Sequence, residues 1–208
     1  MKWKIEYFSE IDSTQKYLLR KKEDLNYYCV WSEYQTDGIG TKGRSWEGVR
    51  GNLFFSFIID KDEFSFIPLQ SISVYFSFIL YKVLSRYQEN LLIKWPNDIY
   101  ILKEKPKKLS GILTNIRKNK IICGIGINTK YAPKIKGEYE SGCLDKKIKN
   151  DRILKEFLYE LQKKKPWEEI FIEYKKVFEK SKKFFGIEYE LNNDATLKAI
   201  NGRSNNCS

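Results

Sequence analysis

The chain has 208 residues, a formal net charge of +11, no histidine and four cysteines. This length supports one main domain with a buried core. The missing histidines and the absence of a CxxC pair argue against a zinc site and a histidine-based catalytic triad. We expect Cys29, Cys123, Cys143 and Cys207 to be reduced thiols of a cytoplasmic protein, because the sequence has no signal-peptide core and no apolar run of about 18 residues.

The excess of lysine suits a negatively charged partner, such as a nucleic acid, an acidic protein or a nucleotide. Lysines are clustered, as in KEKPKK at 103–108 and KKK at 163–165. Most such lysines only solvate a surface, and the RNP, KH and zinc-finger signatures of nucleic-acid modules are missing. Charge by itself therefore selects no partner.

Hydrophobic periodicity predicts strands and helices along most of the chain. A strand is expected over 2–8, and Ser13 or Asp12 can cap a helix over 14–22. A long, mostly apolar helix is expected over 69–87. Further strands are expected over 27–34, 52–60, 91–95, 98–102, 109–116 and 120–127.

The chain then becomes helical, with amphipathic helices expected over 151–164 and 167–185. The tail that follows offers two short strands and ends in the polar NGRSNNCS. The sequence thus predicts an α+β fold, a mixed β-sheet backed by helices. We expect a main domain over 1–183 and a short, possibly truncated C-terminal β appendage over 184–208.

A glycine-rich loop, QTDGIGTKGRSW at 35–46, joins two of the expected strands. Gly38, Gly40 and Gly43 can take positive φ at little cost, so the backbone can approach a ligand closely. Lys42 and Arg44 add charge, which makes a phosphate or nucleotide cradle one interpretation. The alternative is a solvated hairpin tip. The loop is no dinucleotide fingerprint, because a strand follows it instead of a helix, and no GxxxxGK[ST] motif is present.

Two further motifs place cations near strand ends. In KWPND at 94–98, Lys94 can meet a phosphate and Asp98 can hold Mg²⁺ through water, although an ordinary β-turn also explains this motif. In KLSGIL at 108–113, Lys108 lies at the mouth of a strand and Gly111 inside it. A glycine inside a strand often marks a close approach by a ligand, but a bulge beside an exposed lysine is the plainer alternative.

Two motifs offer contacts for a flat or polar ligand. GIGIN at 124–128 leaves one strand face bare at Gly124 and Gly126, and Asn128 can pair with an adenine edge. The alternative is a buried strand thinned by glycine. DSTQ at 12–15 offers hydroxyl groups at a helix start, where helix capping and ligand binding can coexist.

Taken together and in this order, these motifs resemble the catalytic domain of biotin protein ligases, closely over about 5–130. The resemblance implies a core related to class II aminoacyl-tRNA synthetases, with a short SH3-like C-terminal β appendage. It also implies an ATP-dependent, AMP-forming ligase that uses Mg²⁺ and converts biotin to biotinyl-5′-AMP. Biotin would then pass to one lysine of a biotin carboxyl carrier protein, a subunit of acetyl-CoA carboxylase, or of a similar domain. We expect the monofunctional type, without the DNA-binding domain and repressor role of bifunctional members, as a monomer or weak homodimer with no DNA or membrane partner.

The resemblance also implies roles for individual residues. Lys108 and Arg44 would be catalytic, and Asp98 would hold the metal. The biotin site would comprise Ser13, Thr14, Gln15, Gln35, Gly38, Ile39, Gly40, Thr41, Lys108, Gly111 and Gly124. The ATP and adenylate site would comprise Lys42, Arg44, Trp46, Lys94, Asn97, Gly126 and Asn128.

This chain departs from the family pattern at Ile39 and Thr41, where the usual loop carries arginines. Two rival functions are weighed against the ligase. A lipoate or octanoate transfer enzyme shares the fold but is expected to carry a histidine-containing stretch, which is missing here. A nucleic-acid binder would explain the charge but not the ordered set of lysines and glycine-rich strands.

Overall fold

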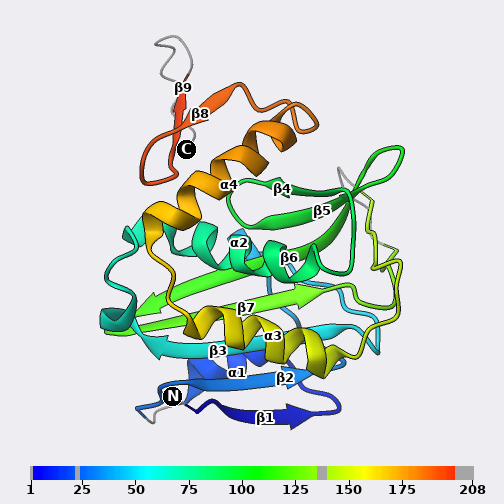
Figure 1. Ribbon diagram of the computed structural model, residues 1–208. Helices are drawn as coiled ribbons and strands as arrows, with labels where there is room; N and C mark the ends of the chain where they lie inside the picture. The colour runs from blue at the N-terminus through cyan, green and yellow to red at the C-terminus, as the bar shows by residue number, and fades with distance from the viewer. Residues whose placement is uncertain (1, 22–23, 135–139, 200–208) are drawn as a thin grey trace.

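The computed structural model describes residues 2–21, 24–134 and 140–199. Its centre is a seven-stranded sheet in the order β1-β2-β3-β7-β6-β5-β4, in which β1 and β2 are parallel and all other neighbours antiparallel (Figure 1). The strands are β1 (Lys4–Phe8), β2 (Tyr28–Ser32), β3 (Leu53–Asp60), β4 (Leu91–Lys94), β5 (Asp98–Leu102), β6 (Pro106–Arg117) and β7 (Lys120–Ile127).

Helices cover both faces of the sheet. The helices are α1 (Thr14–Arg20), α2 (Ile72–Leu84), α3 (Asn150–Gln162) and α4 (Trp167–Lys182). On one face, α2 and α3 bury the main core, which includes Phe55 and Phe57 of β3. On the other face, α1 packs a smaller cluster that includes Leu18 and Ile58. Because side chains alternate along a strand, the residues between the core positions point to the side of α1.

The predicted α+β architecture is confirmed, and the differences lie at element ends. The helix expected over 69–87 begins as a 3₁₀ turn, η3 (Leu69–Ser71), and its α-helical part is only α2. The strand expected over 27–34 begins later because Tyr27 has a φ of 50°, which extended strands do not allow. Ser13 caps α1 as predicted, since its side chain accepts a hydrogen bond from the backbone N–H of Lys16.

The C-terminal appendage is a two-stranded hairpin, β8 (Tyr189–Leu191) with β9 (Leu197–Ala199), as far as the structure describes it. Leu191 and Ala195 are buried in the main core. The indole N–H groups of Trp95 and Trp167 donate to the carbonyls of Ala195 (2.7 Å) and Asn193 (3.0 Å). The hairpin is thus fastened to the main domain. The predicted SH3-like character stays a prediction, and the NGRSNNCS tail with Cys207 lies outside the described residues.

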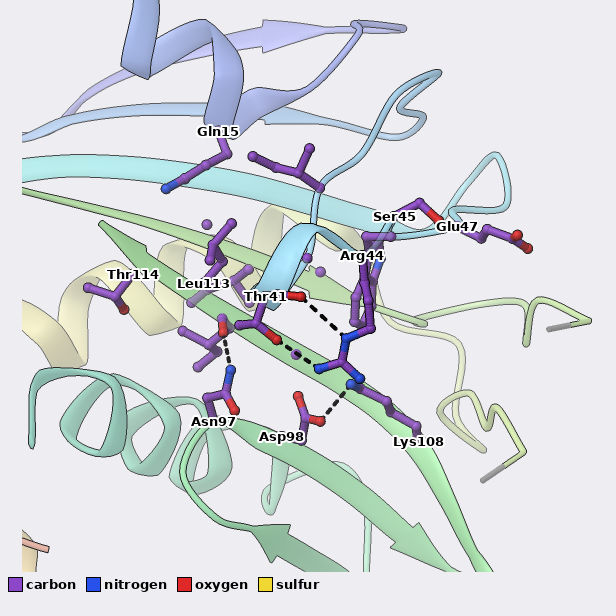
Figure 2. A pocket seen from close by; sticks show the side chains of 18 of the residues that line it. Gln15, Thr41, Arg44, Ser45, Glu47, Asn97, Asp98, Lys108, Leu113 and Thr114 are labelled. Carbon is purple, nitrogen blue, oxygen red and sulfur yellow. Dashed lines mark hydrogen bonds and ion pairs between the residues drawn. The ribbon is translucent and has the colours of Figure 1, made fainter. Parts of the chain in front are cut away.

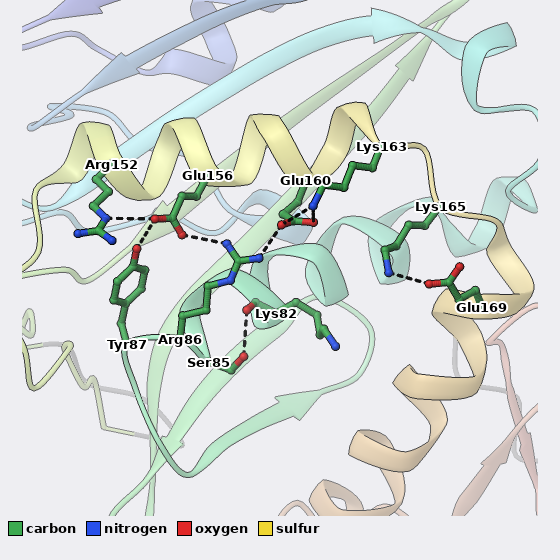
Figure 3. A network of polar contacts seen from close by, with 10 residues as sticks. All are labelled: Lys82, Ser85, Arg86, Tyr87, Arg152, Glu156, Glu160, Lys163, Lys165 and Glu169. Carbon is green, nitrogen blue, oxygen red and sulfur yellow. Dashed lines mark hydrogen bonds and ion pairs between the residues drawn. The ribbon is translucent and has the colours of Figure 1, made fainter.

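Charged side chains connect the helices at the surface (Figure 3). Arg86, just after α2, reaches Glu156 (3.0 Å) and Glu160 (2.5 Å) on α3. Lys82 on α2 pairs with Glu173 on α4 at 2.7 Å. These groups are partly exposed, so each pair contributes only about 0–1 kcal/mol.

Cys29 and Cys123 are buried and Cys143 is partly exposed, and all three are free thiols, as the sequence predicts. Burial raises the pKa of the Cys29 and Cys123 thiols, so both stay protonated. Within the described ranges, no helix is long and apolar enough to cross a membrane.

Candidate active site

A cavity of about 1010 Å³ opens on the face of the sheet that carries α1 (Figure 2). Its size is at the upper end of the roughly 300–1,000 Å³ usual for small-molecule sites, so it has room for an extended, two-part ligand. The start of α1, the glycine-rich loop, the turn after β4 and strands β6 and β7 contribute to its wall. Of the predicted site residues, all except Gly38 line this cavity.

The sheet register explains why distant motifs meet here. Lys94 on β4 lies opposite Asp98 on β5. Asp98 lies opposite Gly111 on β6, which lies opposite Gly126 on β7. Four segments of the sequence therefore form one row across the sheet, with charged residues at one end and bare backbone at the other.

The end of the cavity beside α1 is polar and buried. The carboxamide oxygen of Gln35 accepts from the backbone N–H (2.8 Å) and the hydroxyl (3.1 Å) of Thr14. The Thr14 hydroxyl also lies 2.9 Å from that of Ser56 on β3. These groups are fixed by one another, so they can present donors and acceptors to a ligand without further ordering.

Trp46 occupies the bare strand face that the glycines create. A methyl group on Gly111 or Gly126 would come within 2.6 Å or 2.5 Å of its indole. The sequence predicted room for a flat ligand at Gly124 and Gly126. In the structure the indole of the protein's own Trp46 covers Gly126, together with Gly111, so a ligand ring on this backbone stays a prediction. At Gly124 the neighbouring side chain is Gln15, whose oxygen would lie 2.6 Å from such a methyl group.

Lys108 places its ammonium group inside the cavity. Its Nζ is 2.6 Å from Oδ2 of Asp98 (Figure 2). The same atom is 5.4 Å from the centre of the Trp46 ring. Both partners of the ion pair are largely buried, with side chains 23% and 20% exposed. An anionic group that enters the cavity can replace Asp98 as the partner of the Lys108 ammonium group. A lysine on the open surface offers no such contact inside a cavity.

The same ion pair argues against the predicted metal at Asp98. Lys108 already neutralises the Asp98 carboxylate. A metal ion bound to this carboxylate would lie beside the positive charge of the Lys108 ammonium group. Among the residues that the structure describes, no cluster of three or more acidic, histidine or cysteine side chains could hold a metal ion. The residues present do not fit a metal site built by the protein.

The glycine-rich loop is a tight turn over the cavity. It is closed by backbone hydrogen bonds from Trp46 to Gly38 (2.8 Å) and from Gly40 to Arg44 (2.7 Å), around the short 3₁₀ turn η1 (Thr41–Gly43). Arg44 donates to the hydroxyl of Thr41 at 2.9 Å.

Of the three loop glycines, only Gly43 has a positive φ, of 71°, and its neighbour Lys42 has one of 55°. Gly38 is needed for a different reason: a Cβ there would lie 2.6 Å from the carbonyl oxygen of Trp46. Of these three glycines only Gly43 uses the positive φ that glycine permits, and the close approach at Gly38 is to the backbone of Trp46, so the close approach of a ligand stays a prediction.

Two predicted nucleotide ligands have their amide groups in use. Both N–H bonds of the Asn128 amide are used, for the carbonyls of Lys108 (3.3 Å) and Gly142 (3.0 Å). The residue is only 2% exposed. Pairing of its amide with an adenine edge would break the hydrogen bonds that hold the backbone at Lys108 and Gly142. The amide of Asn97 likewise donates to the carbonyl of Ile112. In this structure both residues position the strands of the cavity.

Sequence reasoning missed several lining residues. Lys94 was expected, and its Nζ lies 5.7 Å from the centre of the Phe185 ring. Ser56, Leu113, Thr114 and Glu47 were not foreseen. A signal existed for Ser56, which is the polar residue between phenylalanines in FFSF, within a strand whose other residues before Asp60 are apolar.

The sequence profile of the biotin/lipoate A/B protein ligase family matches residues 7–130. A biotin–protein ligase of Schizosaccharomyces pombe is 35% identical over 121 residues, which is 49% of this chain and 19% of that protein.

Two solved structures are similar across most of the chain. The Helicobacter pylori biotin acetyl coenzyme A carboxylase synthetase, with bound biotinylated ATP, has a TM-score of 0.74 and 28% identity, covering 95% of this chain and 90% of that one. The Aquifex aeolicus biotin protein ligase, with biotin and ATP, has a TM-score of 0.71 and 26% identity, covering 83% and 77%. The chain spans well under half the length of the curated relatives that it matches, 19% and 38% for the first two.

Proposed function

This chain belongs to the biotin/lipoate A/B protein ligase family, and on that premise we propose that it joins biotin to ATP and then transfers biotin to a protein lysine. The observation that carries this proposal is the position of Lys108. It is the cation on β6 that lines a cavity with a polar, buried pocket at one end and the Trp46 ring beside it. Formation of biotinyl-5′-AMP needs such a cation where a carboxylate and a phosphate meet.

The reaction requires alignment and charge neutralisation more than proton transfer. Biotin's own carboxylate attacks the α-phosphate of ATP, forms a C–O–P anhydride bond and expels pyrophosphate, so no histidine base is needed. Lys108 would leave Asp98 for the reacting carboxylate and α-phosphate, where charge builds up. Lys42, Arg44 and Lys94 supply further positive charge at the wall of the cavity. Any Mg²⁺ would arrive with the ATP phosphates, since the residues that the structure describes offer no cage for it.

The polar pocket beside α1 suits the ring system of biotin. A cyclic urea has two N–H donors and one carbonyl acceptor, and Thr14, Ser56 and Gln35 offer hydroxyl and carboxamide groups within a buried wall. The dithiolane ring of lipoate has no N–H or C=O group to meet them. This chemistry favours biotin over lipoate within the family.

The test is pyrophosphate release by the purified chain with ATP and either biotin or lipoate. We expect release with biotin only. A carrier domain of the biotin-accepting type should then gain the mass of one biotin, and the same domain with its acceptor lysine changed to arginine should gain none. Release with lipoate but not with biotin would contradict the proposal.

A further inference from the structure

The end of helix α4 is fastened to β4, the strand at one end of the sheet order (Figure 1). Ser181, in the last turn of α4, accepts a hydrogen bond from the backbone N–H of Ile93 at 3.0 Å and is fully buried. Phe185 follows four residues later, just beyond the helix, where its own backbone N–H donates to the carbonyl of Lys182 (3.1 Å). The position of Phe185 is therefore fixed relative to β4.

The ring of Phe185 packs on the cavity face of the sheet. Ile93 and Ile99 belong to the main core on the opposite face. Because side chains alternate along a strand, their neighbours Lys94 and Tyr100 point the other way, and both line the cavity. The centre of the Phe185 ring lies 4.9 Å from that of Tyr100 and 5.7 Å from Nζ of Lys94. Phe185 does not line the cavity, so it acts on a ligand through the residues that it touches.

The contact with Phe185 orders the Lys94 ammonium group and leaves its charge intact. An ammonium group within about 6 Å of an aromatic ring is attracted by the negative face of the ring. Asp98, directly opposite Lys94 in the sheet, is already paired with Lys108. A carboxylate would neutralise the ammonium group, whereas a ring restricts its position and keeps the full positive charge for an anion. The long, flexible lysine side chain thus loses less freedom when a phosphate binds.

From these contacts we propose that Phe185 is a positioning residue for the nucleotide end of the cavity, where its ring holds the Lys94 ammonium group for the phosphates of ATP. The inference rests on the proposed function and goes beyond it, because it gives the segment after α4 a part in ATP binding. Biotin carries no phosphate, so the effect of Phe185 should be confined to ATP.

The experiment compares Phe185→Leu and Phe185→Tyr by steady-state pyrophosphate release. Phe185→Leu stays apolar but lacks the ring, and it should raise the KM for ATP by about threefold to fivefold, the change expected for one cation–π contact. The KM for biotin should not change. Phe185→Tyr keeps the ring and should stay close to the wild-type KM. Phe184→Leu is the matched control, since the Phe184 ring lies 5.1 Å from Nζ of Lys183 and is outside the cavity wall.

A second probe separates attraction for a cation from packing. Ring fluorination withdraws electron density from the face of a phenylalanine and weakens its attraction for a cation, with little change of shape. Phenylalanine with increasing ring fluorination, placed at position 185, should raise the KM for ATP stepwise. The same series in a Lys94→Met background should leave the KM for ATP unchanged, because the cation is gone.

The outcomes separate the inference from the function. A wild-type chain that releases no pyrophosphate with biotin and ATP would overturn both. Normal wild-type turnover with an unchanged KM for ATP in Phe185→Leu would overturn the inference alone. A KM for ATP that stays the same across the fluorinated series would also overturn it, since Phe185 would then act by packing. If thermal melting shows that Phe185→Leu does not fold, the fluorinated series decides.

Discussion

Lys108 and Asp98 form an ion pair of 2.6 Å inside the cavity, on neighbouring strands β6 and β5. The pair keeps a desolvated ammonium group at the place where the proposed ligand would bring negative charge. When Lys108 turns from Asp98 to a phosphate, the exchange replaces one charge-assisted hydrogen bond by another of similar strength. The Lys108 ammonium group can thus move from Asp98 to the ligand with little change in free energy.

The first prediction concerns Lys108→Ala. The variant should lose about a hundredfold in the rate of biotinyl-AMP formation, since a charge-assisted contact to the reacting phosphate is worth roughly 3 kcal/mol. The measurement is single-turnover pyrophosphate release. Lys107→Ala is the control, because Lys107 is next along β6 and pairs with Glu140 outside the cavity wall. A loss below about fivefold in Lys108→Ala would show that this lysine is not catalytic.

The second prediction uses glycine-to-alanine substitutions to distinguish the proposed ATP end of the cavity from the proposed biotin end. Gly126→Ala puts a methyl group against the Trp46 indole and should raise the KM for ATP. Gly124→Ala puts it against Gln15 and Ser56 and should raise the KM for biotin. Each change should be about tenfold or more, as overpacking costs roughly 1–3 kcal/mol. Equal effects on both substrates in both variants would speak against two distinct ends.

The third prediction concerns the hydroxyl of Thr41, which receives a hydrogen bond from Arg44 at 2.9 Å. Thr41→Val should release biotinyl-AMP into solvent about threefold to tenfold faster, because Arg44 loses a partner that holds it over the cavity. Thr41→Ser keeps the hydroxyl and should stay close to the wild-type rate. The measurement is adenylate release without carrier protein, and equal rates for both variants would refute the role of the hydroxyl.

The fourth prediction concerns stability and pH. Partial burial opposes the charge on Glu63, but hydrogen bonds from Lys164, Tyr27 and Asn26 outweigh it and lower the pKa of Glu63 to about 2. A carboxylate with a lowered pKa stabilises the fold above its ordinary pKa, and this stabilisation is lost as pH falls from about 4.5 toward 2.

Glu63→Gln should therefore be less stable than the wild type at pH 6, by about 1 kcal/mol once partial exposure is discounted. The difference should shrink as pH approaches the lowered pKa. Urea denaturation of both proteins at several pH values measures it. A difference that stays constant down to pH values near 2 would contradict the pKa argument.

The sequence was sufficient for most of the sheet because its signals are local. Alternation and turn residues located β5, β6 and β7 to within a few residues. The onset of α2 was missed because Pro68 allows either a 3₁₀ or an α-helical first turn, and packing decides between them.

For the site, the sequence identified residue types but not their partners. The sequence predicted that a flat ring could lie on Gly126. It did not show that the fold of the glycine-rich loop places the indole of Trp46 there. Asn128 has the chemistry of a nucleotide ligand, but its amide is used by carbonyls of two other segments. Asn115 carried no signal at all, since the hydrogen bond that it accepts from Gln15 depends on strand pairing across the sheet.

The hydrogen bond from Trp95 to Ala195 has a consequence for biosynthesis. Trp95 begins the turn that carries Asn97 and Asp98, and its partner lies 100 residues later in the chain. At roughly 5–20 residues per second, a ribosome makes Ala195 about 5–20 s after that turn. During this interval the nascent chain can build the sheet but cannot lock one wall of its cavity. The cavity should therefore mature only after Ala195 has been made, and ligands that bind in it would stabilise the chain in which this hydrogen bond has formed.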